Sequence, residues 1–429
     1  MPVINHTLYY QQDLRVPMTS LSFVFHGGGE QQEHEESAGL ARLTSKLLLR
    51  GTRKHTREAL QTTLELLGAE LHASVNETDF VFRISCFTRN IDEVLVLVEE
   101  ILREATFPEE ELVLVKKQDL NKLDAMLQDT ESVVRTGHRF VVYNGTRFGK
   151  FGSKKSIEKT SRNDCAAFFE KVQSCSVLYF TAISDLSKVE IEKKLARFMH
   201  KRLTTGFHVQ PEIHFRTSRG REAFIFHSEQ ATNDRLLWSH AGISATDERR
   251  FALNLIIDAL GSFEGYLFDE LRNKKGWCYG VYAFLFQGTT RPGRIGYYAD
   301  PSDTTSVHLI PELLRSIQTF TKEESFVTRL AERNTSFKNR YAYQLDKHYI
   351  LMSEVYRDRY GIPILTREEY YAKIDAVTSD YAQEVIQKIV DAHNITMVFY
   401  GDEHRITKIL HAIDSEMPIT RYDKEVLIE

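Results

Sequence analysis

The chain has 429 residues, enough for two or more domains, and its 42% hydrophobic and 27% charged composition is that of an ordinary soluble globular protein. Its net charge of −5 gives no general reason to expect nucleic acid or an anionic membrane as a partner. No apolar run of roughly 18 residues is present, and the N-terminus lacks the basic start and apolar core of a signal peptide. We therefore expect a cytoplasmic protein whose four cysteines are reduced thiols.

The first half of the chain mixes strand-like and helical segments. Strands are expected at 19–25, 80–86 and 177–184, and helices at 39–49, 91–105, 109–128 and 189–199. Pro108 stands at the N-terminal boundary of the helix at 109–128 and acidic residues fill its first turn, both usual signals of a helix start. Strands interspersed with long helices predict an α+β fold.

The second half repeats the plan of the first. A strand at 235–240 precedes a helical pattern at 248–260, as 19–25 precedes 39–49. Each half ends in an apolar run that meets an aspartate, Asp185 or Asp402, before an amphipathic helix at 189–199 or 406–413. A repeat at half the chain length predicts two duplicated domains, residues 1–208 and 209–429. The linker is expected at 204–221, a polar segment that contains Pro211.

The segment from Gly39 to Thr52 carries the most specific pattern in the chain. Glycine stands at 39 and 51, alanine at 41 and threonine at 52. This frame resembles the zinc-site helix of the pitrilysin/insulinase peptidases, the inverzincins. Their pattern reads Gly-x-Ala-His-x-x-Glu-His, then any four residues, then Gly-Thr. Arg42, Ser45 and Lys46 stand where that family has His, Glu and His.

This substitution removes the chemistry of the zinc site. Zinc takes neutral imidazole nitrogens and anionic oxygens or thiolates, and two ligands four residues apart share one face of a helix. Arg42 and Lys46 are cations at pH 7 with no lone pair to donate, and Ser45 cannot take a proton from water without an activator. The family's third ligand, a glutamate on a later helix, aligns with Asn121 or Lys122. We therefore expect no metal site in this chain.

Alternative interpretations of this region stay open. The helix at 39–49 can be a plain amphipathic helix whose leucines at 40, 43, 47 and 48 face a core. The cations Arg42 and Lys46, with the lysines at 116, 117 and 122, could form an anion site. We favour the alternative, in which they pair with local carboxylates or face solvent. His26 and His34 flank a triple glycine among several glutamates, where we expect a solvated acidic loop and not a metal site.

A second element, at 260–281, is better preserved. It resembles the family's Leu-Gly-Gly…Ser-x-Leu-Phe-x-x-Leu-Arg-x-x-x-Gly-Leu-x-Tyr pattern, and Arg272 and Tyr279 match its Arg and Tyr, although Glu264 departs from it. In the family this pair reaches across the substrate chamber to the zinc site. The resemblance implies that Arg272 binds a substrate carbonyl or terminal carboxylate and that Tyr279 donates a hydrogen bond to the oxyanion. The plainer alternative makes Arg272 a helix-surface cation and Tyr279 a strand aromatic.

Subunits of this length in the family work as pairs in which one subunit holds zinc and the other does not. The resemblance therefore implies two domains, each a mainly antiparallel sheet packed with helices, in one half of a clam. It also implies a non-catalytic, zinc-free subunit of a heterodimeric metallopeptidase, in which Arg272 and Tyr279 act in trans on a peptide or small unfolded polypeptide. No cofactor is expected in this chain, and zinc is expected in the partner, a zinc-bearing paralogue. The alternative is a peptide-binding or chaperone-like homologue with no hydrolytic role.

Overall fold

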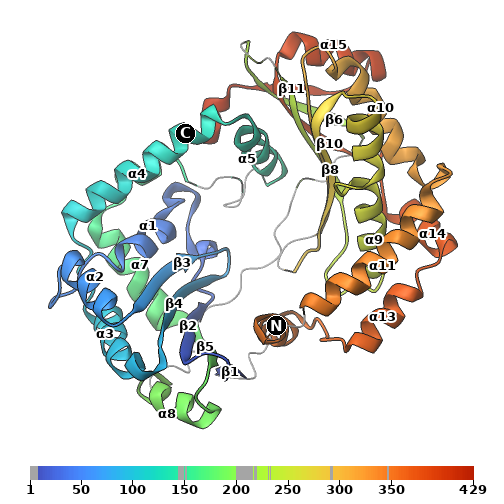
Figure 1. The fold of residues 1–429 in the computed structure, drawn as a ribbon. Helices are drawn as coiled ribbons and strands as arrows, with labels where there is room; N and C mark the ends of the chain where they lie inside the picture. Colours follow the sequence, from blue (N-terminus) through green and yellow to red (C-terminus); the bar gives the residue numbers. More distant parts are fainter. Residues whose placement is uncertain are drawn as a thin grey trace.

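The computed structural model describes residues 8–143, 149, 152–199, 216, 220–229, 231, 233–289, 293–344 and 347–429. Two α+β halves lie side by side, the first blue to green and the second yellow to red (Figure 1). The predicted boundary between residues 208 and 209 lies outside the described residues. Within the described part of the chain, every helix is too short or too polar to cross a bilayer.

The first half is built on a five-stranded sheet. Its strand order is β1 (Leu8–Gln12), β5 (Val177–Ser184), β2 (Met18–His26), β4 (Asp79–Phe87) and β3 (Ala69–Val75). Only the β1–β5 pair is parallel. The helices are α1 (Leu40–Leu47), α2 (Arg57–Leu66), α3 (Ile91–Glu104), α4 (Glu109–Gln128), α5 (Thr130–Val142), α6 (Lys154–Lys159), α7 (Arg162–Cys175) and α8 (Lys188–Met199).

The second half is built on a six-stranded sheet. Its strand order is β11 (Ile419–Tyr422), β6 (Glu222–His227), β10 (Thr396–Gly401), β7 (Arg235–Ala241), β9 (Arg294–Pro301) and β8 (Cys278–Phe286). The helices are α9 (Arg250–Gly261), the π-helical segment η4 (Phe268–Lys274), α10 (Ser306–Thr319), α11 (Phe326–Gln344), α12 (Lys347–Tyr360), α13 (Arg367–Asp375), α14 (Ser379–Ile389) and α15 (Glu403–Ile413).

The two sheets confirm the predicted duplication. The order β1-β5-β2-β4-β3 is repeated as β6-β10-β7-β9-β8, and β11 is added at the outer edge of β6. Corresponding pairs have the same direction: β1–β5 and β6–β10 are parallel, and the remaining shared pairs are antiparallel. Both sheets are therefore mainly antiparallel, as expected from the resemblance.

Most expected elements occur within a few residues of their predicted limits. Helix α4 spans Glu109–Gln128, as predicted. Helix α15 begins at Glu403, three residues before its predicted start, because the Asp402 carboxylate accepts a hydrogen bond from the Arg405 amide and caps the helix. The apolar pattern marked only the face that packs on the sheet, so it missed this polar first turn.

One helix of each half packs against the sheet of the other half. Helix α5, from the first half, packs against β6, β7 and β10 of the second sheet, and α12, from the second half, packs against β1 and β5 of the first. Gly137 makes the first contact possible, since a Cβ atom there would lie only 2.4–2.9 Å from the Phe226 ring. Leu351 and Val355 of α12 pack against a buried group formed by Tyr9, Val24 and Tyr179.

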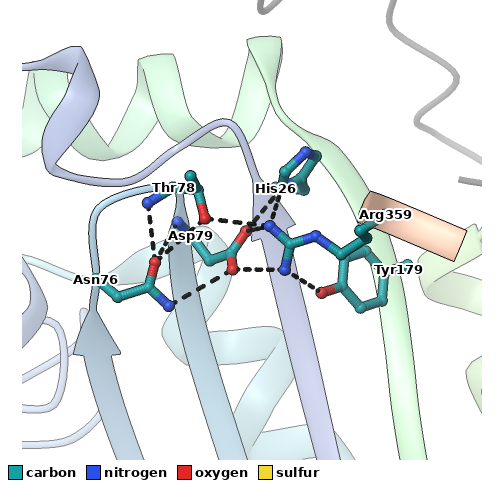
Figure 2. Close-up of polar contacts among 6 residues, drawn as sticks. All are labelled: His26, Asn76, Thr78, Asp79, Tyr179 and Arg359. Atoms are coloured by element: carbon teal, nitrogen blue, oxygen red, sulfur yellow. Dashed lines mark hydrogen bonds and ion pairs between the residues drawn. The ribbon is translucent and has the colours of Figure 1, made fainter. Parts of the chain in front are cut away.

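A buried polar cluster, which we name the clasp, fixes the end of α12 to the first sheet. The clasp consists of His26, Asn76, Thr78, Asp79, Tyr179 and Arg359 (Figure 2). The Arg359 guanidinium lies 2.9 Å from Asp79 Oδ2 and 2.9 Å from His26 Nδ1, and it donates to the Tyr179 hydroxyl at 3.2 Å and to the Thr78 hydroxyl at 3.1 Å. Burial alone would raise the pKa of Asp79, but the hydrogen bond from His26 and the charge of Arg359 outweigh it and lower that pKa.

Candidate functional site

An ion cluster occupies the former zinc position on α1. Arg42 and Lys46 both reach Asp119 of α4: Arg42 Nε lies 3.3 Å from Asp119 Oδ2, and Lys46 contacts Oδ1. The Asp119 side chain is only 1% exposed. The two cations therefore pair with a local carboxylate, which is the arrangement favoured above over an anion site.

The α4 side chain that contacts Arg42 and Lys46 is Asp119, three residues before Lys122. Asn121 and Lys122 are both exposed on α4, whereas Asp119 is buried against α1. The charge of Lys122 still acts on Lys46: burial lowers the pKa of Lys46 most strongly, Lys122 and Arg42 lower it further, and Asp119 opposes them. The sequence held a signal for Asp119, because it lies three residues from Lys122 and so shares a face of the helix with the aligned position.

The side chains at this position do not suit zinc. One carboxylate, already neutralised by two cations, replaces the two imidazoles and the carboxylate that a zinc site of this kind requires. Ser45 is buried and its hydroxyl donates to the Arg42 carbonyl of its own helix at 2.9 Å, so it is not poised as a base. Among the residues that the structure describes, no group of three His, Cys, Asp or Glu side chains could hold a metal ion.

The loop before α1 is more ordered and less solvated than predicted. The Glu33 carboxylate accepts hydrogen bonds from the backbone N–H groups of Gly39, at 3.1 Å, and Ala41, at 2.6 Å, and so caps α1. Burial raises the pKa of Glu33 to about 7, although these two hydrogen bonds oppose the change. His26 is buried in the clasp, whereas His34 and Glu36 are exposed as expected.

The structure brings Arg272 and Tyr279 together. The centre of the Arg272 guanidinium lies 5.0 Å from the Tyr279 ring centroid and 4.6 Å from that of Phe268. Such stacking orients a cation without neutralising it. Within the described residues, no carboxylate lies at ion-pair distance from Arg272. Tyr279 is 77% exposed and Arg272 is partly exposed, so a ligand can reach both groups.

Local backbone features present the two side chains. Arg272 lies on η4, whose π-helical turn is wider than that of an α-helix. Gly276 follows shortly after η4 with a φ of +65°, a conformation that favours glycine. Tyr279 lies on a β-bulge of β8, where the pairing with β9 shifts between Cys278 and Val281. Bulges commonly redirect side chains next to functional sites.

Asp300 of β9 fixes this bulge. Its carboxylate accepts a hydrogen bond from the backbone N–H of Gly280, directly after Tyr279. Burial raises the pKa of Asp300, and the Gly280 amide opposes that change. Sequence reasoning missed Asp300 because only the register of the β8–β9 hairpin places it opposite the bulge.

A cluster of stacked aromatic rings continues from the Arg272/Tyr279 pair across the sheet. Phe268 stacks with Tyr282 at 6.4 Å between centroids, and Tyr282 stacks with Tyr298 of β9 at 6.0 Å. Phe263 packs edge-on against Phe268 and Tyr282, at 5.4 and 5.2 Å. Phe268 and Tyr298 are buried, whereas Phe263 is 67% exposed, so Phe263 can contact an apolar or aromatic side chain of a ligand beside the cation and the phenol.

Two family models match the chain in consecutive segments. "Insulinase (Peptidase family M16)" matches residues 11–145, which include the former zinc helix. "Peptidase M16 inactive domain" matches residues 159–328, which include Arg272 and Tyr279.

Curated relatives and solved structures agree with these matches. A non-peptidase homolog, YmxG, from Helicobacter pylori is 23% identical over 64% of this chain and 63% of its own. The mitochondrial-processing peptidase subunit beta of Pongo abelii is 22% identical over 84% of this chain and 76% of its own. The matches span 63%, 60% and 61% of the lengths of this Helicobacter relative and of two uncharacterized zinc proteases from Streptomyces coelicolor and Rickettsia bellii, somewhat less than two thirds of each.

The solved structure of a peptidase M16 inactive domain from Pseudomonas fluorescens shares the fold, with a TM-score of 0.79, 19% identity and coverage of 92% of this chain and 95% of that one. A chain of complex III from Candida albicans also shares it, with a TM-score of 0.67, 16% identity and coverage of 92% and 93%. The matched segments, the duplicated fold and the altered zinc position lead to one conclusion: this chain belongs to the insulinase (M16) peptidase family, as an inactive homologue.

Proposed function

We propose that this chain is the zinc-free subunit of a heterodimeric metallopeptidase. Arg272 and Tyr279 then act at the zinc site of a zinc-bearing paralogue, and the substrate is a peptide or a small unfolded polypeptide held between the two subunits. The observation that carries the proposal is the contrast between the two sites: the zinc position is filled by an internal ion cluster, whereas Arg272 and Tyr279 are stacked together and open to a ligand.

The chemistry of the pair fits this role. A fixed guanidinium can bind a carbonyl or carboxylate oxygen of the substrate, and a phenol can donate a hydrogen bond to the oxyanion that forms when water attacks a peptide carbonyl. Zinc in the partner would supply the activated water and polarise the carbonyl. Asp300 takes part only by holding the bulge that presents Tyr279.

Reconstitution with the zinc-bearing paralogue tests the proposal. The isolated chain should contain no stoichiometric zinc and should not cleave peptides, and mixing it with the paralogue should produce peptidase activity. Tyr279→Phe should lower kcat of the pair by about 10- to 1000-fold, as loss of one oxyanion donor does in other hydrolases, with little change in KM. A pair that stays fully active with Tyr279→Phe or Arg272→Ala would exclude the role given to that residue.

A second candidate is a peptide-binding or chaperone-like protein without hydrolysis. The name of the Helicobacter relative, a non-peptidase homolog, favours it. The two functions differ in whether the neighbouring gene encodes an intact His-x-x-Glu-His homologue. Peptide binding by the isolated chain, without activity in any pair, would support this second function.

A further inference from the structure

The first sheet carries a polar row next to the part that α12 covers, and within this row Arg83 is exposed, Thr181 is partly exposed and Ser22 is buried. Arg83 of β4 is paired across the sheet with Ser22 of β2, which is paired in turn with Thr181 of β5. Because side chains alternate along a strand, these three lie on the same face as the neighbouring row formed by Val24, Val81 and Tyr179. Helix α12 packs against that apolar row through Leu351 and Val355. Arg83, at the β4 end of the polar row, stays exposed.

Arg83 is a cation without an anion among the residues that the structure describes. It is exposed in the middle of a strand, where a charged side chain gains little from packing. Among the described residues, no carboxylate lies within ion-pair distance of its guanidinium, and no hydrogen bond to a protein group occupies it. Its five N–H groups are therefore available to a ligand from outside the chain.

The polar row forms the floor of a cavity between the two halves. This cavity has a volume of about 420 Å³, and its walls include Ser22, Arg83, Thr181, Met352, Tyr356 and Phe286. Glu77 and the clasp residue Asp79 also line it. Asp79 precedes Arg83 by four residues on the same strand, so their Cα atoms are about 13 Å apart along β4, and Asp79 is already paired with Arg359.

Strand β8 connects this cavity to the Arg272/Tyr279 pair. It carries Tyr279 near its start and Phe286, a wall of the cavity, at its end, about 23 Å further along. Phe284 and Phe286 are 37% and 42% exposed, while Val281 and Ala283, on the opposite face, are buried. In the described part of the sheet β8 is an edge strand, so its outer backbone groups can pair with an added strand.

We propose that the cavity binds a carboxylate of an extended peptide at Arg83, and that the peptide lies along the free edge of β8 with apolar side chains against Phe284 and Phe286. This inference rests on the proposed peptide-holding chamber and adds the class of its ligand: an extended segment with alternate apolar side chains and one carboxylate. Charge complementarity selects this occupant, because Arg83 at one end and Arg272 at the other are cations without an anion among the described residues. The carboxylate comes from a C-terminus or from an Asp or Glu side chain.

Binding of defined peptides to the isolated chain tests the inference. The probes are peptides of about ten alternating leucines and threonines with a neutral N-terminal dansyl group. One ends in an amide, one in a free carboxylate, and one ends in an amide but contains a single glutamate. At least one acidic form should bind about tenfold or more tightly than the neutral form, the ratio expected for one charge-assisted hydrogen-bonded contact, and the preferred form identifies the source of the carboxylate.

Arg83→Gln should remove this preference, and Arg83→Lys should retain part of it. Arg53→Gln is the matched control, since Arg53 is an exposed arginine outside the cavity lining and should leave the preference unchanged. Phe286→Ser should weaken all three peptides together. Because Arg83 is exposed and unpaired within the described residues, its variants should unfold at the wild-type temperature.

Equal affinity for neutral and acidic peptides, wild-type binding by Arg83→Gln, or no binding of any probe would each overturn the inference. None of these results bears on the zinc-dependent activity of the pair. Conversely, an inactive pair together with Arg83-dependent binding would exclude the subunit role and leave the carboxylate site in place.

Discussion

Replacing Asp79 with asparagine tests how strongly the clasp holds α12 on the first sheet. The side chains of Asp79 and Arg359 are 6% and 7% exposed, and the guanidinium donates to both carboxylate oxygens, at 2.9 and 3.2 Å. Breaking a buried ion pair by removing one charge costs about 3–5 kcal/mol, because the remaining charge stays buried without an anion. Asparagine keeps one acceptor oxygen, so we expect Asp79→Asn to lower the free energy of unfolding by about 2–4 kcal/mol.

Urea unfolding followed by far-UV circular dichroism measures this change. The matched control is Asp92→Asn, which removes an aspartate that also pairs with a lysine of another helix, Lys194, at 2.8 Å, but is 71% exposed. Exposed pairs contribute about 0–1 kcal/mol, so the control should unfold almost as the wild type does. Equal losses in the two variants would refute the argument that burial gives the clasp its strength.

The clasp also has a defined pH dependence. The pKa of Asp79 is lowered in the folded protein, so its contribution to stability is present above the ordinary aspartate pKa and is lost as the pH falls through the lower folded value. The difference between wild type and Asp79→Asn should therefore be constant near neutral pH and shrink below about pH 4. A difference that persists undiminished into strong acid would contradict the role of the carboxylate charge.

Three further predictions concern other parts of the chain. Asp119→Ala should lower the free energy of unfolding by about 2–4 kcal/mol in urea, because Lys46 loses its buried anion; a loss under about 0.5 kcal/mol would contradict the ion cluster. The folded pKa of Glu33, about 7, lies above its ordinary value of 4.5, so its contribution is full below pH 4.5 and is lost as the pH rises through 7. Thermal unfolding should therefore show wild-type stability falling relative to Glu33→Gln between about pH 5 and 8, and parallel curves would refute this. Gly137→Ala should cost about 1–3 kcal/mol in spite of the better helix propensity of alanine, because the new Cβ meets Phe226; a stabilised variant would show that α5 can shift.

The sequence was sufficient to predict what depends on short segments. Helix α4 has its predicted limits because Pro108 and the acidic first turn are local signals. The duplication could also be predicted, since each half repeats a strand, an aspartate and a helix at the same relative position. Arg272 and Tyr279 could be paired through the resemblance to the family's Arg and Tyr element, although only the structure shows that a π-helical turn and a bulge bring them together.

Contacts between distant segments could not be predicted. Arg359 and Asp79 are 280 residues apart, and no pattern along the chain connects them. The contact of Asp119 with Arg42 and Lys46 was not predicted, because the alignment gives only a position, whereas the rotation of α4 against α1 decides which side chain faces the partner helix. The loop around His26 and Glu33 was expected to be solvated because its composition is polar, yet the clasp and the cap of α1 draw these two side chains inward.

Because α5 and α12 each pack on the sheet of the other half, the two halves cannot complete their folding one after the other while the chain is being translated. The first sheet is complete once β5 has emerged, but the helix that covers Tyr9, Val24 and Tyr179 is translated only after most of the second half. At 5–20 residues per second this interval lasts roughly 8–30 s, during which an apolar patch of the nascent chain is exposed to the cell. The first half therefore cannot reach its final form co-translationally on its own, and a chain truncated before α12 should depend on a holding chaperone to stay in solution.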